Sequence, residues 1–147
     1  MHVAVIGGGP AGLYFSIQMA LRDPACRVRV IERNRRGSTF GWGVVFSDGT
    51  LGRLREADRA SYDRIAEQFV HWDDIEIHYR GRVIRSGGHG FCGIARQELL
   101  DILTRRAGEL GVEIEFEREL ADEDELGGAD LIVAADGINS TIRRKYA

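Results

Sequence analysis

Three glycines near the start of the chain, Gly7, Gly9 and Gly12, constrain its fold more than any other feature. They follow the apolar run at residues 3–6, which is typical of a strand buried on both faces. Pro10 lies among them and suits the first turn of a helix. The apolar residues that follow recur at the spacing of one helix face, at Leu13, Ile17, Ala20 and Leu21. We therefore expect a strand that turns sharply into a helix.

A second strand is expected at residues 27–32, where Val28 and Val30 alternate with arginines. The helix before it ends ahead of Asp23-Pro24, so strand, helix and strand together have the size of a βαβ unit. The two strands of such a unit are parallel. The sequence thus predicts an α/β fold with a parallel sheet and a Rossmann-like βαβ start.

The glycine spacing, Gly-x-Gly-x-x-Gly, predicts a dinucleotide site in this setting. The first glycine permits the turn, the second lets the backbone approach a pyrophosphate, and the third allows close helix packing. Glu32 ends the second strand, where a carboxylate accepts hydrogen bonds from ribose hydroxyls. An acidic residue here argues against a ribose 2′-phosphate, which leaves NAD or FAD. The alternative is a glycine turn without a ligand.

The pattern of residues 33–86 predicts a loop, helices and a β-hairpin. Residues 33–48, rich in glycine and aromatics, are expected to form an ordered loop. Helical spacing indicates a short helix at residues 51–57 and more helix after a cap at Ser61. Alternation at residues 72–86 predicts an inserted antiparallel hairpin that turns at Gly81.

The last third predicts a loop, a helix and two strands. A second glycine-rich loop at residues 86–93 precedes a helix whose apolar face includes Leu99 and which ends at Gly111. A strand is expected at residues 112–116, followed by an acidic, solvated turn. Another buried strand is expected at residues 131–135.

The turn after this last strand, Asp136-Gly137, is a second indication of a site. Ligands in doubly wound sheets collect beyond the carboxyl ends of the strands, so this turn is expected to face the same crevice as the first glycine turn. Ser140 is either a helix cap or a ligand contact, and the residues alone favour neither.

Composition excludes several classes of protein. In 147 residues, 44% hydrophobic and 29% charged content is typical of one globular domain. A net charge of -3 argues against binding to nucleic acid or to an anionic membrane surface. The uncharged stretch at residues 3–21 is interrupted by glycines and has no basic leader, which argues against a signal peptide or a membrane span. Cys26 and Cys92 lack metal-ligand spacing, so we expect no metal site, and a reducing cytoplasm is the simplest setting.

Three segments carry a family resemblance: GGGPAG at residues 7–12 with Glu32-Arg33, RQELL at residues 96–100, and DGINSTIRR at residues 136–144. In order and spacing they resemble the amino-terminal part of the FAD-dependent aromatic hydroxylases of the para-hydroxybenzoate hydroxylase type. Residues 40–49 and 86–96 resemble the branch that acts on coenzyme A thioesters of aromatic acids, the salicylyl-CoA 5-hydroxylases and 2-aminobenzoyl-CoA monooxygenase/reductases.

The resemblance implies that one set of residues binds FAD: Gly7, Gly9, Pro10, Ala11, Gly12, Glu32, Arg33, Val44, Arg96, Asp136 and Gly137. The glycines would hold the pyrophosphate, and Glu32 the adenosine ribose with Arg33 beside it. The loop containing Val44 would pass beside the flavin ring, and Arg143 would support the second turn. Arg96 would contact the cofactor, although from the residues alone a surface arginine on an amphipathic helix is the stronger interpretation.

The family resemblance also implies an activity and a domain organisation. Such enzymes hydroxylate a small aromatic substrate, here an aromatic acid or its coenzyme A thioester, with FAD, O2 and NADH or NADPH. They are much longer, so residues 1–147 would be an N-terminal FAD-binding fragment, inactive alone. The hairpin and loop at residues 72–92 would reach toward a substrate domain that is largely absent, and a homodimer is left open. No residue here is expected to act as a general base, so catalytic residues stay unassigned.

Two rival functions stay open: an NAD-dependent dehydrogenase domain, and a non-catalytic binding module on a flavoprotein-like scaffold. His89 is expected to be hydrogen-bonded or solvent-facing rather than catalytic, because it has no evident partner. Trp42, Phe46 and Phe91 are expected to pack. The arginines between residues 27 and 36 are expected to form a solvated edge, with Arg35 or Arg36 as a secondary candidate for attracting a coenzyme A phosphate or the nicotinamide donor.

Overall fold

The structure, a computed structural model, describes residues 1–120 and 122–146. The chain divides into two compact units. The first unit comprises Met1–Phe40 and Leu99–Ala147, and the second comprises Gly41–Glu98. Each is described separately below.

A four-stranded parallel sheet forms the centre of the first unit, in the order β8-β2-β1-β9. Its strands are β1 (His2–Ile6), β2 (Arg27–Ile31), β8 (Glu113–Glu115) and β9 (Leu131–Ala134). All three neighbouring pairs are parallel, with β1 between β2 and β9. The predicted α/β fold with its βαβ start is therefore confirmed.

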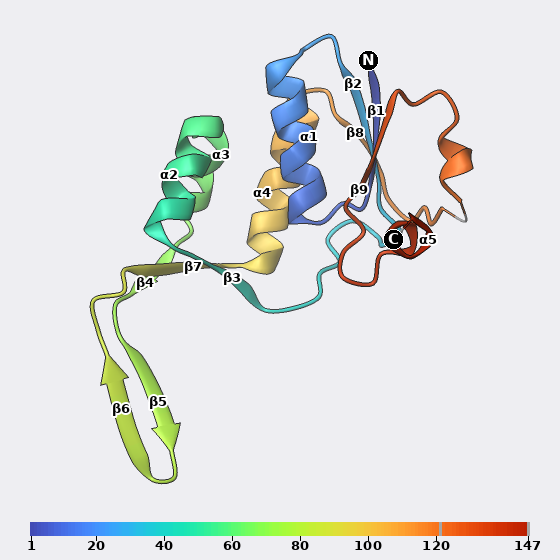
Figure 1. The fold of residues 1–147 in the computed structure, drawn as a ribbon. Helices are drawn as coiled ribbons and strands as arrows, with labels where there is room; N and C mark the ends of the chain where they lie inside the picture. The colour runs from blue at the N-terminus through green and yellow to red at the C-terminus, as the bar shows by residue number, and fades with distance from the viewer. Residues whose placement is uncertain (121, 147) are drawn as a thin grey trace. The chain divides into compact units, whose positions relative to one another are not determined.

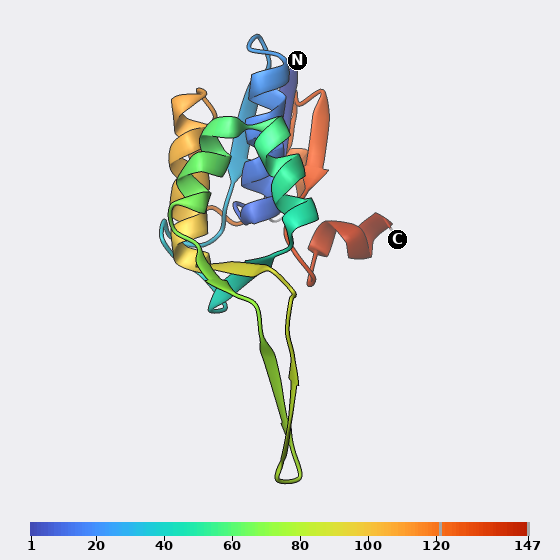
Figure 2. The same ribbon diagram turned by 90° about the vertical axis from the view of Figure 1, so that its left-hand side faces the viewer.

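Two helices lie along one face of this sheet, α1 (Pro10–Arg22) and α4 (Arg96–Glu109), as Figures 1 and 2 show. Their apolar residues recur at helical spacing, and burying each large aliphatic side chain stabilises the fold by about 1.5–3 kcal/mol. The buried side chains are Leu13 and Ile17 on α1, and Leu99, Ile102 and Leu103 on α4. The helix predicted before Gly111 is confirmed, and that glycine has the positive φ of 78° typical of a helix end.

The opposite face of the sheet carries a smaller apolar cluster. Ala4 and Ile31 contact Leu126, which is 5% exposed and lies at the end of the short 3-10 helix η1 (Glu123–Leu126). The acidic stretch before Leu126 forms the expected turn, with Asp124 and Glu125 exposed to solvent. The Asp122 side chain accepts from the Asp124 amide at 3.1 Å, so the polar residues cap a turn that buries its leucine.

Strand β9 departs from the expected buried strand. Leu131 and Ile132 are 41% and 38% exposed. The reason is that β9 lies at the edge of the sheet and pairs only with β1 among the described residues. After β9 the chain turns and forms the last helix, α5 (Thr141–Tyr146).

An antiparallel sheet in the second unit joins β3 (Gly43–Phe46), β7 (Phe91–Ala95) and β4 (Val70–Trp72) in that order. Loops were expected over most of β3 and β7, and those expectations are wrong. Pairing between distant segments creates these strands, and short-range patterns do not reveal it. The glycines fit because space is tight: a Cβ on Gly93 would lie 3.0 Å from the Trp72 ring.

Two helices follow β3: α2 (Asp48–Ala57) and α3 (Arg59–Ala66). The second helix begins earlier than expected, because its cap is Asp58 rather than Ser61. The Asp58 carboxylate accepts from the Ala60 amide at 3.2 Å and from the Ser61 hydroxyl at 2.7 Å. Phe69 lies beyond the helix and packs on Phe46, with ring centroids 5.6 Å apart.

The predicted hairpin is confirmed, with strands β5 (Ile75–Tyr79) and β6 (Arg82–Ser86). Its turn places Arg80 and Gly81 at φ values of 48° and 74°, the two positive values of a type I′ turn. In Figure 1 the hairpin extends away from β4 and β7 of the same unit. No helix among the described residues is long and apolar enough to span a membrane.

Candidate cofactor site

The glycine turn between β1 and α1 is packed tightly at Gly7 and Gly12 but has open space at Gly9. A Cβ on Gly7 would lie 2.4 Å from the Ala135 carbonyl oxygen, and Gly7 has a φ of 107°. A Cβ on Gly12 would lie 2.0 Å from the Gly7 carbonyl oxygen. A Cβ on Gly9 would meet no atom within 4 Å. The three glycines therefore differ in environment: Gly7 turns the chain, Gly12 lets the helix approach the turn closely, and Gly9 leaves space beside the backbone.

The N-terminus of α1 completes this cradle. Gly9 is its N-cap and makes no side-chain cap bond, and Pro10 is the first helical residue. The amides of Ala11 and Gly12 have no acceptor within the helix, as in any first turn. Unpaired amides and the positive end of the helix dipole together suit an anion such as a diphosphate.

Glu32 directly follows β2, and its carboxylate contacts the glycine turn. Its Oε2 accepts from the Gly8 backbone amide at 2.7 Å, and its Oε1 accepts from the Asn34 backbone amide at 2.8 Å. Gly8 was not among the residues predicted for the site, but its amide holds the Glu32 carboxylate. A Cβ there would lie 3.0 Å from the Cβ of Glu32, so a side chain would displace the carboxylate. The run of three consecutive glycines, in which Gly8 is the middle one, was the signal that could have identified it.

Asp136 and Gly137 follow β9 and lie at the same carboxyl edge of the sheet as the glycine turn, as expected. The close approach of Gly7 to Ala135 joins the two turns directly. Burial raises the pKa of Asp136, but hydrogen bonds from the Ser140 hydroxyl and from backbone amides outweigh it, so the pKa is lowered. Among the described residues its Oδ1 is buried without a hydrogen-bond partner.

Ser140 caps the helix that follows it, which is one of its two predicted roles. Its hydroxyl accepts from the Arg143 amide at 2.9 Å at the start of α5. The Arg143 guanidinium donates to the Ile138 carbonyl oxygen. Arg143 therefore supports the second turn, as predicted.

Val44 and Arg96 belong to the second unit, where they lie near each other. Val44 is half-buried in β3 and pairs with Ile94, and the Arg96 amide donates to the Trp42 carbonyl oxygen at 3.1 Å. Within the described parts of the chain, the Arg96 Nε is buried and has no hydrogen-bond partner. A buried Nε does not fit the alternative of a surface arginine whose guanidinium is fully solvated. Whether either residue reaches FAD stays a prediction.

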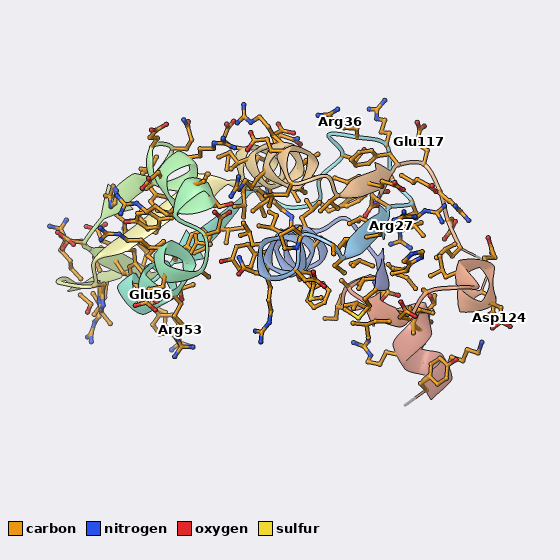
Figure 3. The ribbon with its side chains drawn as sticks, turned by 90° about the horizontal axis from the view of Figure 1, so that it is seen from above. Arg27, Arg36, Arg53, Glu56, Glu117 and Asp124 are labelled. Atoms are coloured by element: carbon orange, nitrogen blue, oxygen red, sulfur yellow. The ribbon has the colours of Figure 1, made fainter. Side chains whose placement is uncertain are left out.

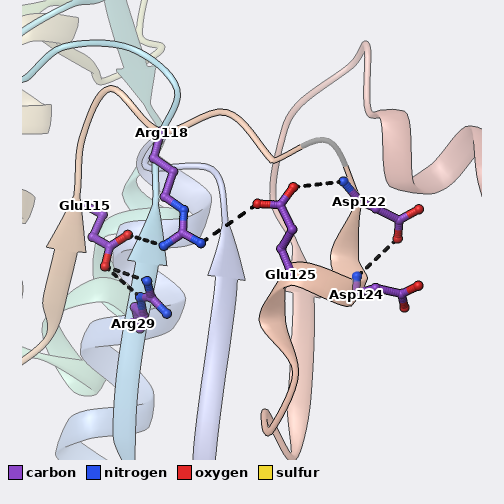
Figure 4. A network of polar contacts seen from close by, with 6 residues as sticks. All are labelled: Arg29, Glu115, Arg118, Asp122, Asp124 and Glu125. Carbon is purple, nitrogen blue, oxygen red and sulfur yellow. Dashed lines mark hydrogen bonds and ion pairs between the residues drawn. The ribbon is translucent and has the colours of Figure 1, made fainter.

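The arginines near β2 differ in environment. Arg29 donates to Glu115 on β8 at 2.6 Å, and Arg118 donates to the other oxygen of that carboxylate at 2.6 Å, as Figure 4 shows. The Arg118 hydrogen bond, and then Arg29, lower the pKa of Glu115 despite partial desolvation. The expectation of a solvated edge is therefore wrong for Arg29. It holds for Arg36, which points outward in Figure 3.

Arg33 is also near the surface. Its guanidinium lies 4.0 Å from the Glu119 carboxylate, and both side chains are mostly exposed. Such a pair contributes little to stability. The role of Arg33 beside the ribose stays a prediction.

The aromatic residues of the second unit behave unequally. Trp42 is 98% exposed, so the expectation that it packs is wrong for the described residues. Phe91 packs against Trp72, with ring centroids 6.0 Å apart. His89 stacks on Phe91 and lies 2.8 Å from the Ser86 hydroxyl, so it is a hydrogen-bonded, exposed residue as expected. The described residues bring together no group of three or more metal-binding side chains.

The first unit therefore fits FAD at its adenosine diphosphate end. Open space at Gly9 and the uncapped helix suit the diphosphate, and the carboxylate of Glu32 lies at the end of the next strand. The structure brings together Gly7 to Gly12, Glu32, Asp136 and Gly137. It leaves Val44 and Arg96 in a separate unit.

Comparison with known proteins identifies relatives of this chain. Salicyloyl-CoA 5-hydroxylase from a Streptomyces species is 43% identical over 147 residues, which are 100% of this chain and 28% of that protein. The 3-hydroxy-4-methyl-anthranilyl-[aryl-carrier protein] 5-monooxygenase of Streptosporangium sibiricum is 33% identical over 147 residues, covering 41% of its length. The chain thus spans well under half of these relatives.

A solved structure shows the same fold. The C294A mutant of 2-methyl-3-hydroxypyridine-5-carboxylic acid oxygenase superimposes with a TM-score of 0.77 at 29% identity, over 99% of this chain and 42% of that one. The family model of the FAD binding domain matches residues 1–147. A glycine turn, an uncapped helix and a carboxylate at one edge of a parallel sheet are what such a domain requires. The chain belongs to the FAD binding domain family.

Proposed function

We propose that this chain is the FAD-binding part of a flavoprotein monooxygenase that hydroxylates an aromatic substrate. The observation that carries the proposal is the bond between the Gly8 amide and the Glu32 carboxylate, which joins the diphosphate cradle to the ribose position. The activities of the relatives support the aromatic substrate. Because the chain spans a minor part of those relatives, we propose that the complete enzyme is longer and that residues 1–147 alone are inactive.

The residues divide the work of binding. The amides of Ala11 and Gly12 bind the diphosphate, and Glu32 accepts from the ribose. Asp136 stays ionised because its hydrogen bonds lower its pKa, and it orients the cofactor from the neighbouring turn. Arg33, Val44, Arg96 and Gly137 contact FAD at further points. We assign no catalytic acid or base among these residues.

Bound FAD supplies the redox chemistry: two electrons from NADH or NADPH reduce O2, one oxygen atom enters the aromatic ring, and the other leaves as water. The protein's part is to bind, to orient and to keep solvent away from the reaction. We propose that the hairpin and loop at residues 72–92 reach toward a substrate domain. Exposed apolar side chains on the hairpin, such as Ile77 at 55%, support this role.

The finer proposal is that the substrate is a coenzyme A thioester of an aromatic acid. The 43% identity to salicyloyl-CoA 5-hydroxylase supports it. Arg35 and Arg36 are exposed and could attract a phosphate of coenzyme A or of the nicotinamide donor.

A cytoplasmic location and a homodimer also stay predictions. Localisation of a tagged enzyme and light scattering at several concentrations would test them.

Titration of the chain with FAD and with NAD+ tests the core of the proposal. We expect FAD to bind and NAD+ to bind weakly or not at all, measured by calorimetry and by quenching of flavin fluorescence. The opposite preference would favour a dehydrogenase domain that uses the same glycine turn.

The activity is tested on the complete polypeptide. NAD(P)H oxidation should be stimulated by salicyloyl-CoA and much less by salicylate, which is the matched acid without coenzyme A. Equal stimulation by salicyloyl-CoA and salicylate would refute the thioester proposal but not the proposed aromatic hydroxylation. No stimulation by any aromatic compound, with FAD bound, would support the non-catalytic module.

A further inference from the structure

Asn34 makes two hydrogen bonds to the carboxylate of Glu32, and both go to the same oxygen. The Asn34 backbone amide donates to Oε1 at 2.8 Å, and its side-chain Nδ2 donates to Oε1 at 2.5 Å. The other oxygen, Oε2, accepts one bond, from the Gly8 amide at 2.7 Å. A carboxylate oxygen accepts about two hydrogen bonds. Oε1 is therefore filled by protein donors, whereas Oε2 keeps one acceptor position at the glycine turn.

The backbone around Glu32 is fixed as well. Its amide donates to the Glu115 carbonyl oxygen at 2.8 Å, and its carbonyl oxygen accepts from the Arg118 amide at 3.1 Å. The Asn34 carbonyl oxygen accepts from the Glu117 amide at 3.1 Å. The loop that carries Asn34 is thus held against the segment after β8, so Asn34 is placed to orient the carboxylate persistently.

We propose that Asn34 is a positioning residue that occupies Oε1 of Glu32, so that Glu32 binds the adenosine ribose of FAD through Oε2 alone. This inference rests on the proposed FAD site. It differs from a site in which both carboxylate oxygens accept from the two ribose hydroxyls. One ribose hydroxyl then donates to Glu32 and contributes to the binding affinity. The other hydroxyl makes no bond to Glu32.

ADP analogues test this asymmetry directly, because ADP carries the ribose and diphosphate without the flavin. The measurement is the affinity of the chain for ADP, 2′-deoxy-ADP and 3′-deoxy-ADP by calorimetry. One deoxy analogue should bind about tenfold or more weakly than ADP, the loss expected for a hydrogen bond to a charged group, and the other within about twofold. Equal losses for both analogues would overturn the inference.

Asn34→Ala removes the Nδ2 donor but keeps the backbone amide, so one acceptor position of Oε1 becomes available to the second hydroxyl. In this variant both deoxy analogues should bind more weakly than ADP, so the asymmetry should disappear. An asymmetry as large as in the wild-type chain would show that Asn34 does not set it. Circular dichroism establishes that the variant is folded.

Asn34→Asp keeps the shape but places a second carboxylate beside Oε1. Two such carboxylates share a proton at low pH, and that proton restores the lost hydrogen bond. At higher pH both carboxylates are ionised, and their repulsion displaces the Glu32 carboxylate from the ribose. ADP affinity of this variant should therefore fall as pH rises from 5 to 8, relative to the wild-type chain. A loss that is the same at every pH would indicate a merely structural role and would overturn the inference.

A matched control accounts for the added charge. Gln68→Glu makes the same amide-to-acid change on an exposed side chain of the second unit, and it should bind ADP as the wild-type chain does at every pH. The charged groups around the Asn34 loop are common to all variants, so their titration cancels in the comparison. They are Arg29, Arg33, Glu115, Glu117, Arg118 and Glu119.

Failure of the inference is distinguishable from failure of the proposed function. If Glu32→Ala leaves ADP affinity unchanged, or the wild-type chain binds neither ADP nor FAD, the proposed site is wrong and the inference falls with it. If Glu32→Ala weakens binding but the deoxy analogues lose equally, the site stands and only the role of Asn34 is refuted.

Discussion

The parallel sheet of the first unit and the β5–β6 hairpin of the second are both rich in valine and isoleucine, yet their burial is opposite. Val5 and Val30 in the sheet are 0% exposed, whereas Ile77 and Ile84 in the hairpin are 55% and 58% exposed. Helices cover one face of the sheet, and among the described residues of its own unit no element covers the hairpin. Strand composition alone therefore does not decide burial, because burial needs a second layer.

The two regions are also held by different interactions. The sheet depends on packed apolar side chains, which contribute most of the folding free energy. The hairpin depends on its type I′ turn and on cross-strand pairs such as Ile77 with Ile84 and Glu76 with Arg85. An isolated two-stranded hairpin is marginally stable in water. The hairpin should therefore open locally while the sheet stays folded.

The largest expected effect separates the two regions by stability. Ile17→Ala empties a position on α1 that is 0% exposed and should lower the free energy of unfolding by about 2–5 kcal/mol. Ile77→Ala in the hairpin should lower it by less than about 0.5 kcal/mol. Urea denaturation measures both. Similar losses would contradict the contrast between the regions.

The next effect concerns ligand binding. Glu32→Ala removes the ribose acceptor and should weaken FAD binding by about 1–3 kcal/mol, because charged acceptors form the stronger hydrogen bonds. Glu76→Ala, which removes a carboxylate from the hairpin, should leave FAD affinity unchanged. Fluorescence titration compares the two variants. An equal loss in both would argue against a ribose-specific role.

A smaller effect depends on pH. Arg118 and Arg29 lower the pKa of Glu115 in the folded chain, so this ion pair stabilises the fold above the ordinary glutamate pKa, and the stabilisation is lost as pH falls through the lowered value. Glu115→Gln should cost under about 1 kcal/mol at pH 7, because the group is partly exposed, and nothing at the acidic limit. Glu113→Gln, on the same strand and exposed, is the control. Chemical denaturation at several pH values measures the difference, and a cost independent of pH would contradict it.

The smallest effect belongs to the hairpin turn. Arg80 has a φ of 48°, a conformation that asparagine adopts more readily. Arg80→Asn should stabilise the hairpin by about 0.5 kcal/mol and slow amide hydrogen exchange in β5 and β6, without changing the urea midpoint of the sheet. A shift of that midpoint would mean that the hairpin and the sheet unfold together.

Local patterns were sufficient where an element's own residues decide its conformation. The glycine turn, the helix after it and the Arg80–Gly81 turn were foreseeable because a positive φ or a close approach requires glycine. Strands β3 and β7 were missed because each exists only through pairing with a distant partner. Gly8 and Asn34 were missed because their roles appear only once β2 returns beside the first turn.

The amino-acid sequence by itself determined the βαβ start, the glycine turn and the presence of an acidic residue directly after β2, because these depend on spacing and on backbone freedom within short segments. Only the tertiary structure decided which atoms bind that acidic residue, which strands pair in the second unit and which apolar side chains are buried. Hydrogen bonds and burial form between residues far apart in the chain, and short-range periodicity carries no record of them.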